Sequence, residues 1–291
     1  MENYRSDLII EAKGMEAGAS VRDGRYPGKR TEIKGVEIKE TRKEDNSMAV
    51  TVVQIQNEEG AKAMERPVGT YITMELPELL SEEEPLKELA EKELDRQIKE
   101  LLKGKKAKHM LVVGLGNREV TADAVGPLTV DNLIVTRHYF QEESVGKAVG
   151  KKYRKVSAFV PGVMAQTGME TMELIRGVVE EAKPDVVVVV DALAAKSPKR
   201  LNTTIQLTDT GISPGAGVGN NRKELNERSL GCPVIAIGVP TVLDAVTIAR
   251  EEEIEEVKNF FVMPRTIDSA VRYVSELVAG GINRVNQKEE F

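Results

Sequence analysis

The stretch that decides the fold is DVVVVVD, at residues 185–191. Five consecutive valines between two aspartates predict a strand without polar alternation, and such a strand needs an apolar layer on both faces. HMLVVGL at 109–115 and PVIAIGV at 233–239 have the same character. The pattern therefore predicts a sheet that is covered on both faces, which is typical of α/β proteins.

Strand-like and helix-like segments alternate from about residue 106 onward. The candidate strands are 109–115, 155–160, 185–190, 203–208 and 233–239. The candidate helices are 124–138, 169–182, 241–260 and 266–285. This order predicts a three-layer α/β fold with a mostly parallel sheet.

The N-terminal part of the chain has a different pattern. Alternating side chains predict strands around 50–55 and 71–75, with charged, glycine-containing stretches between them. A helix with an apolar stripe follows between Ser81 and Gly104. We therefore expect a β-rich subdomain at 8–80 and an α/β catalytic core at 81–291.

Composition narrows the classes of function. The 291 residues carry a formal net charge of −6, which argues against a nucleic-acid-binding protein, since such proteins normally have a basic face. No apolar run approaches the roughly 20 residues of a membrane span, and the first residues lack the apolar core of a signal peptide. Cys232 is the single cysteine, which fits a reducing compartment, so we expect a cytoplasmic protein.

Two aspartates are the best candidates for chemistry. Asp123 follows the 109–115 strand after a short loop, and Asp191 directly follows the 185–190 strand. A carboxylate at the carboxyl end of such a strand lies at the rim of the sheet, where α/β proteins form their active-site crevices. Two neighbouring carboxylates cannot both ionise easily and can share a proton as an acid–base pair. Alternatively, Asp123 caps a helix and Asp191 bonds to a neighbouring loop; spacing alone does not decide between these interpretations.

Two glycine motifs resemble known sites but lack required parts. GLGN at 114–117 would begin a dinucleotide-binding fingerprint, but the position of the third glycine is Glu119, so a tight turn is favoured. GISPG at 211–215 has the spacing of a nucleophile elbow. Pro214, however, has no N–H for an oxyanion, and both histidines precede the serine.

The remaining reactive side chains are weaker candidates. Cys232 precedes an apolar strand, where a free cysteine usually behaves as a small buried hydrophobe. Lys196 and Ser197 could form a catalytic serine–lysine dyad. Neighbours in sequence rarely face each other, however, and lysines in a charged loop of this kind are usually solvated. His138 is interpreted as a packing residue. Two histidines and one cysteine argue against a zinc site, whereas a metal held by carboxylates stays an alternative.

At these residues the chain resembles a known family, the spore germination proteases. The matching stretches are GLGN…VTADAVGP (114–127), VTRH (135–138), VSAFVPGVM (156–164), DALAA (191–195), NTTIQLTDTGISPGAGVGNNR (202–222) and LGCPVIAIGVPTVLDAVTIA (230–249). With the N-terminal segment they cover nearly the whole chain.

The resemblance implies an endopeptidase that degrades small acid-soluble spore proteins during germination. It assigns the catalytic roles to Asp123 and Asp191, without a cofactor, in an α/β fold related to hydrogenase-maturation peptidases. It also implies a homotetramer in the spore interior, with no direct contact to nucleic acid or membrane.

The resemblance further implies an inactive precursor. RSDLIIEA at 5–12 fits the family's self-processing site, so we expect a propeptide at residues 1–7 and a cut between Asp7 and Leu8. The region after Glu253 is shorter than in the bacillus relatives. The glycine-rich loop 211–219 is expected to shape the substrate groove, or else to be a flexible connection.

Two other functions stay open from the sequence. One is a metal-dependent peptidase in which the same two aspartates are ligands. The other is a non-enzymatic nucleotide-binding module that uses residues 114–117.

Overall fold

The computed structural model describes residues 6–12, 33–43, 45–81, 83–214, 223–249, 254–257 and 260–288. One nine-stranded sheet runs through this part of the chain. Its strands are β1 Val36–Arg42, β2 Ala49–Ile55, β3 Gly69–Glu75, β4 His109–Gly114, β5 Lys155–Phe159, β6 Val186–Ala195, β7 Thr204–Thr208, β8 Val234–Asp244 and β9 Phe261–Val262. Their order is β1-β2-β3-β7-β8-β6-β4-β5, and β9 pairs with β8.

Most strands point the same way. β8, β6, β4 and β5 are parallel neighbours, whereas β1, β2, β3, β7 and β8 are joined by antiparallel pairs. Consequently β1, β3, β4, β5, β6 and β8 share one direction, and β2, β7 and β9 run against it. Among the parallel strands, β4, β6 and β8 have the continuous apolar runs that burial on both faces requires.

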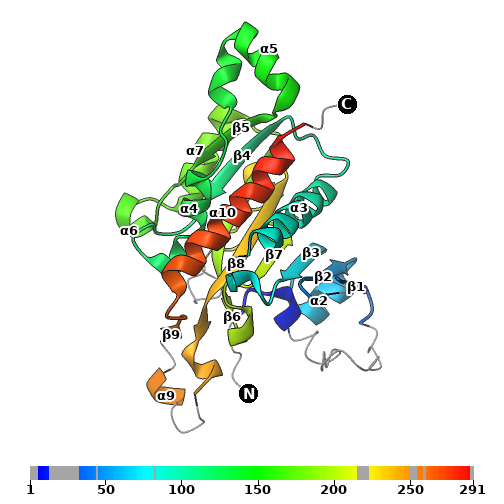
Figure 1. Ribbon diagram of the computed structural model, residues 1–291, viewed down its shortest axis with the longest axis vertical. Helices are drawn as coiled ribbons and strands as arrows, with labels where there is room; N and C mark the ends of the chain where they lie inside the picture. The colour runs from blue at the N-terminus through cyan, green and yellow to red at the C-terminus, as the bar shows by residue number, and fades with distance from the viewer. Residues whose placement is uncertain are drawn as a thin grey trace.

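Helices cover both faces of the parallel strands (Figure 1). They are α2 Glu58–Met64, α3 Glu84–Leu101, α4 Val125–Asp131, α5 Glu143–Lys152, α6 Met164–Thr167, α7 Thr171–Ala182, α8 Glu227–Leu230, α9 Ile254–Val257 and α10 Ile267–Asn286. On one face, α3, α4 and α10 pack on Val112 and Val188. On the other face, α7 packs on Val113 and Val189. The predicted three-layer α/β fold is therefore confirmed.

The N-terminal strands extend the same sheet. β3 pairs with β7 from Tyr71↔Thr208 to Glu75↔Thr204. One face of β2 and β3 joins the large core beneath α3. The other face packs against α2 and the segment containing Ile9 and Ala12. The division into units at residues 7/8 and 80/81 stays a prediction.

The expected helix at 241–260 is wrong in its first part. β8 continues to Asp244 because it pairs with β6 as far as Ala195↔Leu243, beyond a bulge next to Ala194. Within that range, helical structure in the described residues is confined to the 3₁₀-helix Ala245–Thr247 and to α9. The apolar residues of 239–243 are compatible with a strand or a helix, and pairing with the neighbouring strand β6 makes this segment a strand.

The expected helix at 124–138 is also too long. α4 ends at Asp131, and residues Arg137–Gln141 form a separate 3₁₀-helix. Thr136 is held beside β5, since its N–H donates to Val156 O at 3.0 Å and its Oγ1 accepts from Val156 N at 2.9 Å. Among the described helices, none is both long and apolar enough to cross a membrane.

Candidate active site

Asp123 lies in the loop that follows β4, at the last residue of the 3₁₀-helix Thr121–Asp123. Its Oδ2 accepts a hydrogen bond from Asn117 N at 2.7 Å. The loop closes tightly at Gly116, where φ is +109° and an added Cβ would lie 1.9 Å from Asp123 O. The interpretation of Asp123 as a helix cap is wrong, because Ala124 precedes α4 and has no side-chain cap bond.

Asp191 lies inside β6 and not directly after it. It is 6% exposed, pairs with Gly238 of β8 and accepts a hydrogen bond from Ala192 N at 3.0 Å. The strand extends four residues beyond Asp191, to Ala195. Asp191 is therefore held by its pairing with β8, directly after the last residue of β6 that also pairs with β4.

The fold brings the two aspartates into one cavity. Leu115 N donates to Val190 O at 2.8 Å, which ties the loop after β4 to the residue before Asp191. Thr241 Oγ1 donates to Ala122 O at 2.6 Å, so β8 holds the 3₁₀-helix that carries Asp123. Both aspartates line a cavity of about 1090 Å³. Such a cavity is large enough for several residues of a peptide.

The glycines at 114–117 serve the close packing of this loop. A Cβ on Gly114 would lie 2.3 Å from Gly126 O, and Gly126 itself lies against Leu115 and Val190 O. The backbone of the chain thus fills the space beside these glycines. The positive φ of Gly116 supports the tight-turn interpretation, and Gly126 is a close-packing position beside the site that sequence reasoning did not single out.

The weaker candidates have other surroundings. Burial, and next the charge of Glu227, raise the pKa of the Cys232 thiol, which suits a packed cysteine more than a nucleophile. Ser213 and Pro214 line the cavity, while residues 215–219 of the glycine-rich loop lie outside the described part of the chain. His138 is exposed and stacks near Tyr139, with ring centroids 3.9 Å apart.

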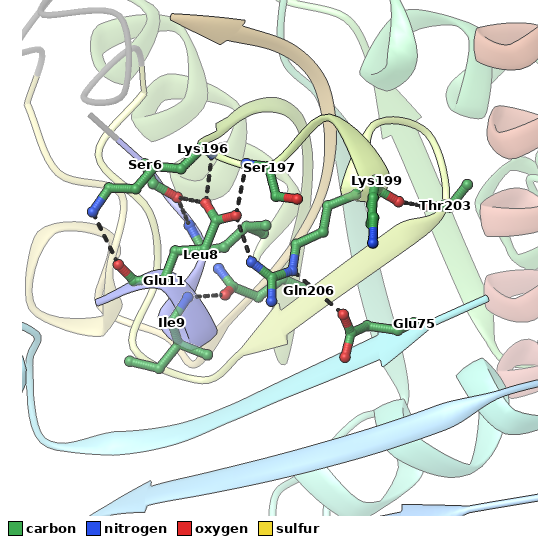
Figure 2. A network of polar contacts seen from close by, with 11 residues as sticks. Ser6, Leu8, Ile9, Glu11, Glu75, Lys196, Ser197, Lys199, Thr203 and Gln206 are labelled. Atoms are coloured by element: carbon green, nitrogen blue, oxygen red, sulfur yellow. Dashed lines mark hydrogen bonds and ion pairs between the residues drawn. The ribbon is translucent and has the colours of Figure 1, made fainter. Parts of the chain in front are cut away.

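Lys196 and Ser197, the weakly supported dyad candidates, instead form a binding loop for the N-terminal segment. The backbone N–H groups of both residues donate to the Glu11 carboxylate, at 2.7 Å and 3.1 Å (Figure 2). Ser6, Asp7 and Glu11 line the same cavity as the two aspartates. Asp7, on the N-terminal side of the predicted cut, therefore lines the same cavity as the candidate catalytic groups.

Metal ligands do not gather in the described residues. No group of three or more His, Cys, Asp or Glu side chains there is arranged to hold an ion. The role of the two aspartates stays a prediction.

Comparison with known families decides what kind of protein this is. The family model described as germination protease matches residues 9–257, which is most of the chain. The chain belongs to the germination protease family. It is therefore a peptidase, a hydrolase of peptide bonds.

Its relatives within the germination protease family span nearly the whole chain. The germination protease of Caldanaerobacter subterraneus is 42% identical, with 96% of this chain and 93% of the relative covered. That of Clostridium tetani is 42% identical, with coverages of 91% and 81%. That of Priestia megaterium is 46% identical, with coverages of 86% and 66%.

One solved structure is similar to this germination protease family member in part of its fold. It is the [NiFe] hydrogenase maturation protease HycI from Thermococcus kodakarensis, with 18% sequence identity and a TM-score of 0.38. The similarity covers 64% of this chain and 97% of HycI.

Proposed function

We propose that this protein is an endopeptidase that begins the degradation of small acid-soluble spore proteins during spore germination, with Asp123 and Asp191 as its catalytic pair. One observation carries the proposal: in a chain of the germination protease family, both aspartates line the same cavity. Ser6, Asp7 and Glu11 of the chain's own N-terminal segment also line that cavity.

The chemistry requires an acid and a base. One carboxylate takes a proton from water as the water oxygen adds to the scissile carbonyl carbon. The other, protonated carboxylic acid first stabilises the developing oxyanion and then supplies a proton to the leaving nitrogen. The C–N bond breaks, and the products are a carboxylic acid and an amine. No cofactor takes part in this scheme.

Amide substitution tests the pair. Asp123→Asn and Asp191→Asn are each expected to lower kcat/KM on a small acid-soluble spore protein by about 10³-fold, within the range of acid–base catalysis. Asp209→Asn is the matched control, since Asp209 lines the same cavity but accepts from Thr70 N at 2.8 Å. Full activity of either Asp123→Asn or Asp191→Asn would refute the paired-carboxylate mechanism.

A chelator tests the alternative in which the same two aspartates bind a metal ion. If chelation abolishes cleavage and a divalent ion restores it, the two aspartates act as metal ligands. Cleavage that is insensitive to chelator supports the cofactor-free mechanism.

We also propose that the chain is made as a precursor that cuts itself between Asp7 and Leu8. Asp7, the residue before this bond, lines the cavity of the two aspartates, which supports this site. N-terminal sequencing of the mature protein from sporulating cells should begin at Leu8. Mature protein that begins at Met1 or Glu2 would contradict the proposal.

The family resemblance also leads us to propose a homotetramer in the spore interior. Light scattering on the purified protein should give four times the chain mass of 32.0 kDa. A monomer or dimer at micromolar concentration would contradict this.

A further inference from the structure

Gln206 of β7 contacts the peptide bond at which the chain is proposed to cut itself. Its Nε2 donates to Asp7 O at 3.1 Å, and its Oε1 accepts from Ile9 N at 2.6 Å. Asp7 O is the carbonyl oxygen of the Asp7–Leu8 bond. A side-chain amide therefore donates to the oxygen on which negative charge develops when water adds to that carbonyl carbon.

The second hydrogen bond determines which end of the amide faces this carbonyl. Ile9 N–H can only donate and therefore requires Oε1, so the NH₂ group is directed at Asp7 O, which can only accept. Figure 2 shows the Gln206 amide with its oxygen on Ile9 N. Gln206 is 8% exposed, so little water competes for these bonds. The donor is thus oriented before any reaction begins.

The sheet places Gln206 in the same cross-strand row as Asp191. Gln206 pairs with Gly238 of β8, and Gly238 pairs with Asp191 of β6. Residues that pair directly on neighbouring strands point to the same face of a sheet, so Gln206 and Asp191 project from one face, two strands apart. Both line the cavity that Asp123 also lines. Gln206 therefore belongs to the site of the two aspartates.

The N-terminal segment is anchored on both sides of its contact with Gln206. Asp7 N donates to Ala194 O at 3.1 Å, and Ala194 N donates to Asp7 Oδ2 at 2.9 Å. Further along the segment, the Glu11 carboxylate accepts from Arg200 Nη1 at 2.6 Å. These bonds hold the carbonyl group of Asp7 in place against the Gln206 amide.

Gln206 contacts only main-chain atoms in its two bonds to the segment. Every peptide has a carbonyl and an N–H at these positions, whatever its side chains. A substrate in the place of the chain's own segment would therefore present its scissile carbonyl to the same donor. The distance of 3.1 Å lies within the range of about 2.7–3.1 Å for donors to an oxyanion.

We propose that Gln206 is a catalytic residue of this peptidase, and that its Nε2 donates to the oxyanion of the tetrahedral intermediate in the self-cut and in the cleavage of substrate. The inference rests on the proposed peptidase function and its cut at Asp7–Leu8. As the water oxygen bonds to the carbonyl carbon, the π electrons of the C=O bond move onto its oxygen, and the hydrogen bond from Nε2 becomes charge-assisted. As the C–N bond breaks, the C=O bond forms again. Gln206 transfers no proton, and the protonated carboxylic acid of the aspartate pair is the other donor.

Two substitutions test this role on the full chain. Gln206→Met removes both polar atoms at similar length, and Gln206→Glu keeps the shape but has no N–H to donate. Each is expected to lower kcat on a small acid-soluble spore protein by about 10²- to 10³-fold, as the loss of one oxyanion donor does. KM should change by less than about 10-fold, since a neutral hydrogen bond to bound substrate contributes at most about that much. The first-order rate of the self-cut should fall by a factor similar to that of kcat.

Thr73→Val is the matched control. Thr73 of β3 pairs directly with Gln206, is 0% exposed, and has no hydrogen-bond partner for its Oγ1 among the described residues. The valine keeps the shape of the side chain in the same row, so kcat and KM should stay at the wild-type values. If Gln206→Glu does not fold, Gln206→Met still decides the question.

The outcomes separate this role from the peptidase function. An unchanged kcat in Gln206→Met, with or without a raised KM, overturns the catalytic role and leaves the peptidase function standing, because Gln206 then at most holds the peptide. An equal loss of kcat in Thr73→Val also overturns it, since the loss then comes from disturbed packing. Wild-type protein that cleaves neither itself nor the spore protein contradicts the peptidase function, and the role of Gln206 falls with it.

Discussion

Gly116→Ala is expected to damage the site through one contact. An added Cβ would lie 1.9 Å from Asp123 O, whereas real Cβ contacts are essentially never below 3.0 Å. The Asp123 backbone must therefore move by about 1.1 Å, and a shift of about 1 Å at a catalytic group can cost about 10²-fold in rate. We expect kcat/KM to fall by about that factor.

The same change also lowers the free energy of unfolding. A non-glycine residue at φ +109° costs about 1–3 kcal/mol, and the overlap with Asp123 adds about 1–3 kcal/mol. Gly104→Ala is the matched control. Its φ is +76°, but nothing lies within 4 Å of the added Cβ, so it should cost about 1–2 kcal/mol without loss of activity.

Urea unfolding and cleavage of a small acid-soluble spore protein measure the two effects on both variants. If Gly116→Ala matches Gly104→Ala in stability and in kcat/KM, the packing of the loop against Asp123 does not position the carboxylate.

Two further predictions concern the framework of the site. Burial, then Lys155 and Arg137, lower the pKa of His109 below its usual 6.5. The unfolded chain therefore binds the proton more tightly than the folded chain, and the free energy of unfolding falls as pH falls from about 7 toward 5. His109→Gln should flatten the accompanying fall of Tm with pH. Thr241→Val removes the hydroxyl that donates to Ala122 O, and it should lower the free energy of unfolding in urea by about 1–3 kcal/mol and reduce the cleavage activity. Thr241→Ser keeps the hydroxyl and should retain both stability and activity. A Thr241→Val variant with unchanged stability and activity would contradict the role of Thr241 in holding the loop.

The layers of the fold could be predicted from the sequence because they depend on local patterns. The valine run of β6 and the apolar stripe of α3 each require a covered face, whatever else surrounds them. The ends of β6 and β8 could not be predicted in the same way. Residues after Asp191 and Val239 are mostly apolar in both strands, and pairing between the two strands, with β9 at the end of β8, keeps them extended.

The candidate site was partly accessible from sequence. Its two aspartates follow strand-like runs, and the resemblance to the germination protease family predicted that they act in one site. Gln206 and Arg200 gave no signal, since their partners Ile9 and Glu11 lie 197 and 189 positions away in the chain. Contacts of that range depend on the order of strands in the sheet, which local patterns do not determine.

The position of β7 has a consequence for synthesis of the chain. β3 lies between β2 and β7, but β7 is made ~130 residues after β3, which takes roughly 6–25 s at ribosomal rates. During that time the nascent chain carries an unpaired strand edge on β3, which is a template for association with other chains. β7 in turn acquires its second neighbour only when β8 has been made. The two halves of the sheet are thus joined late, by a five-residue strand from the last third of the chain.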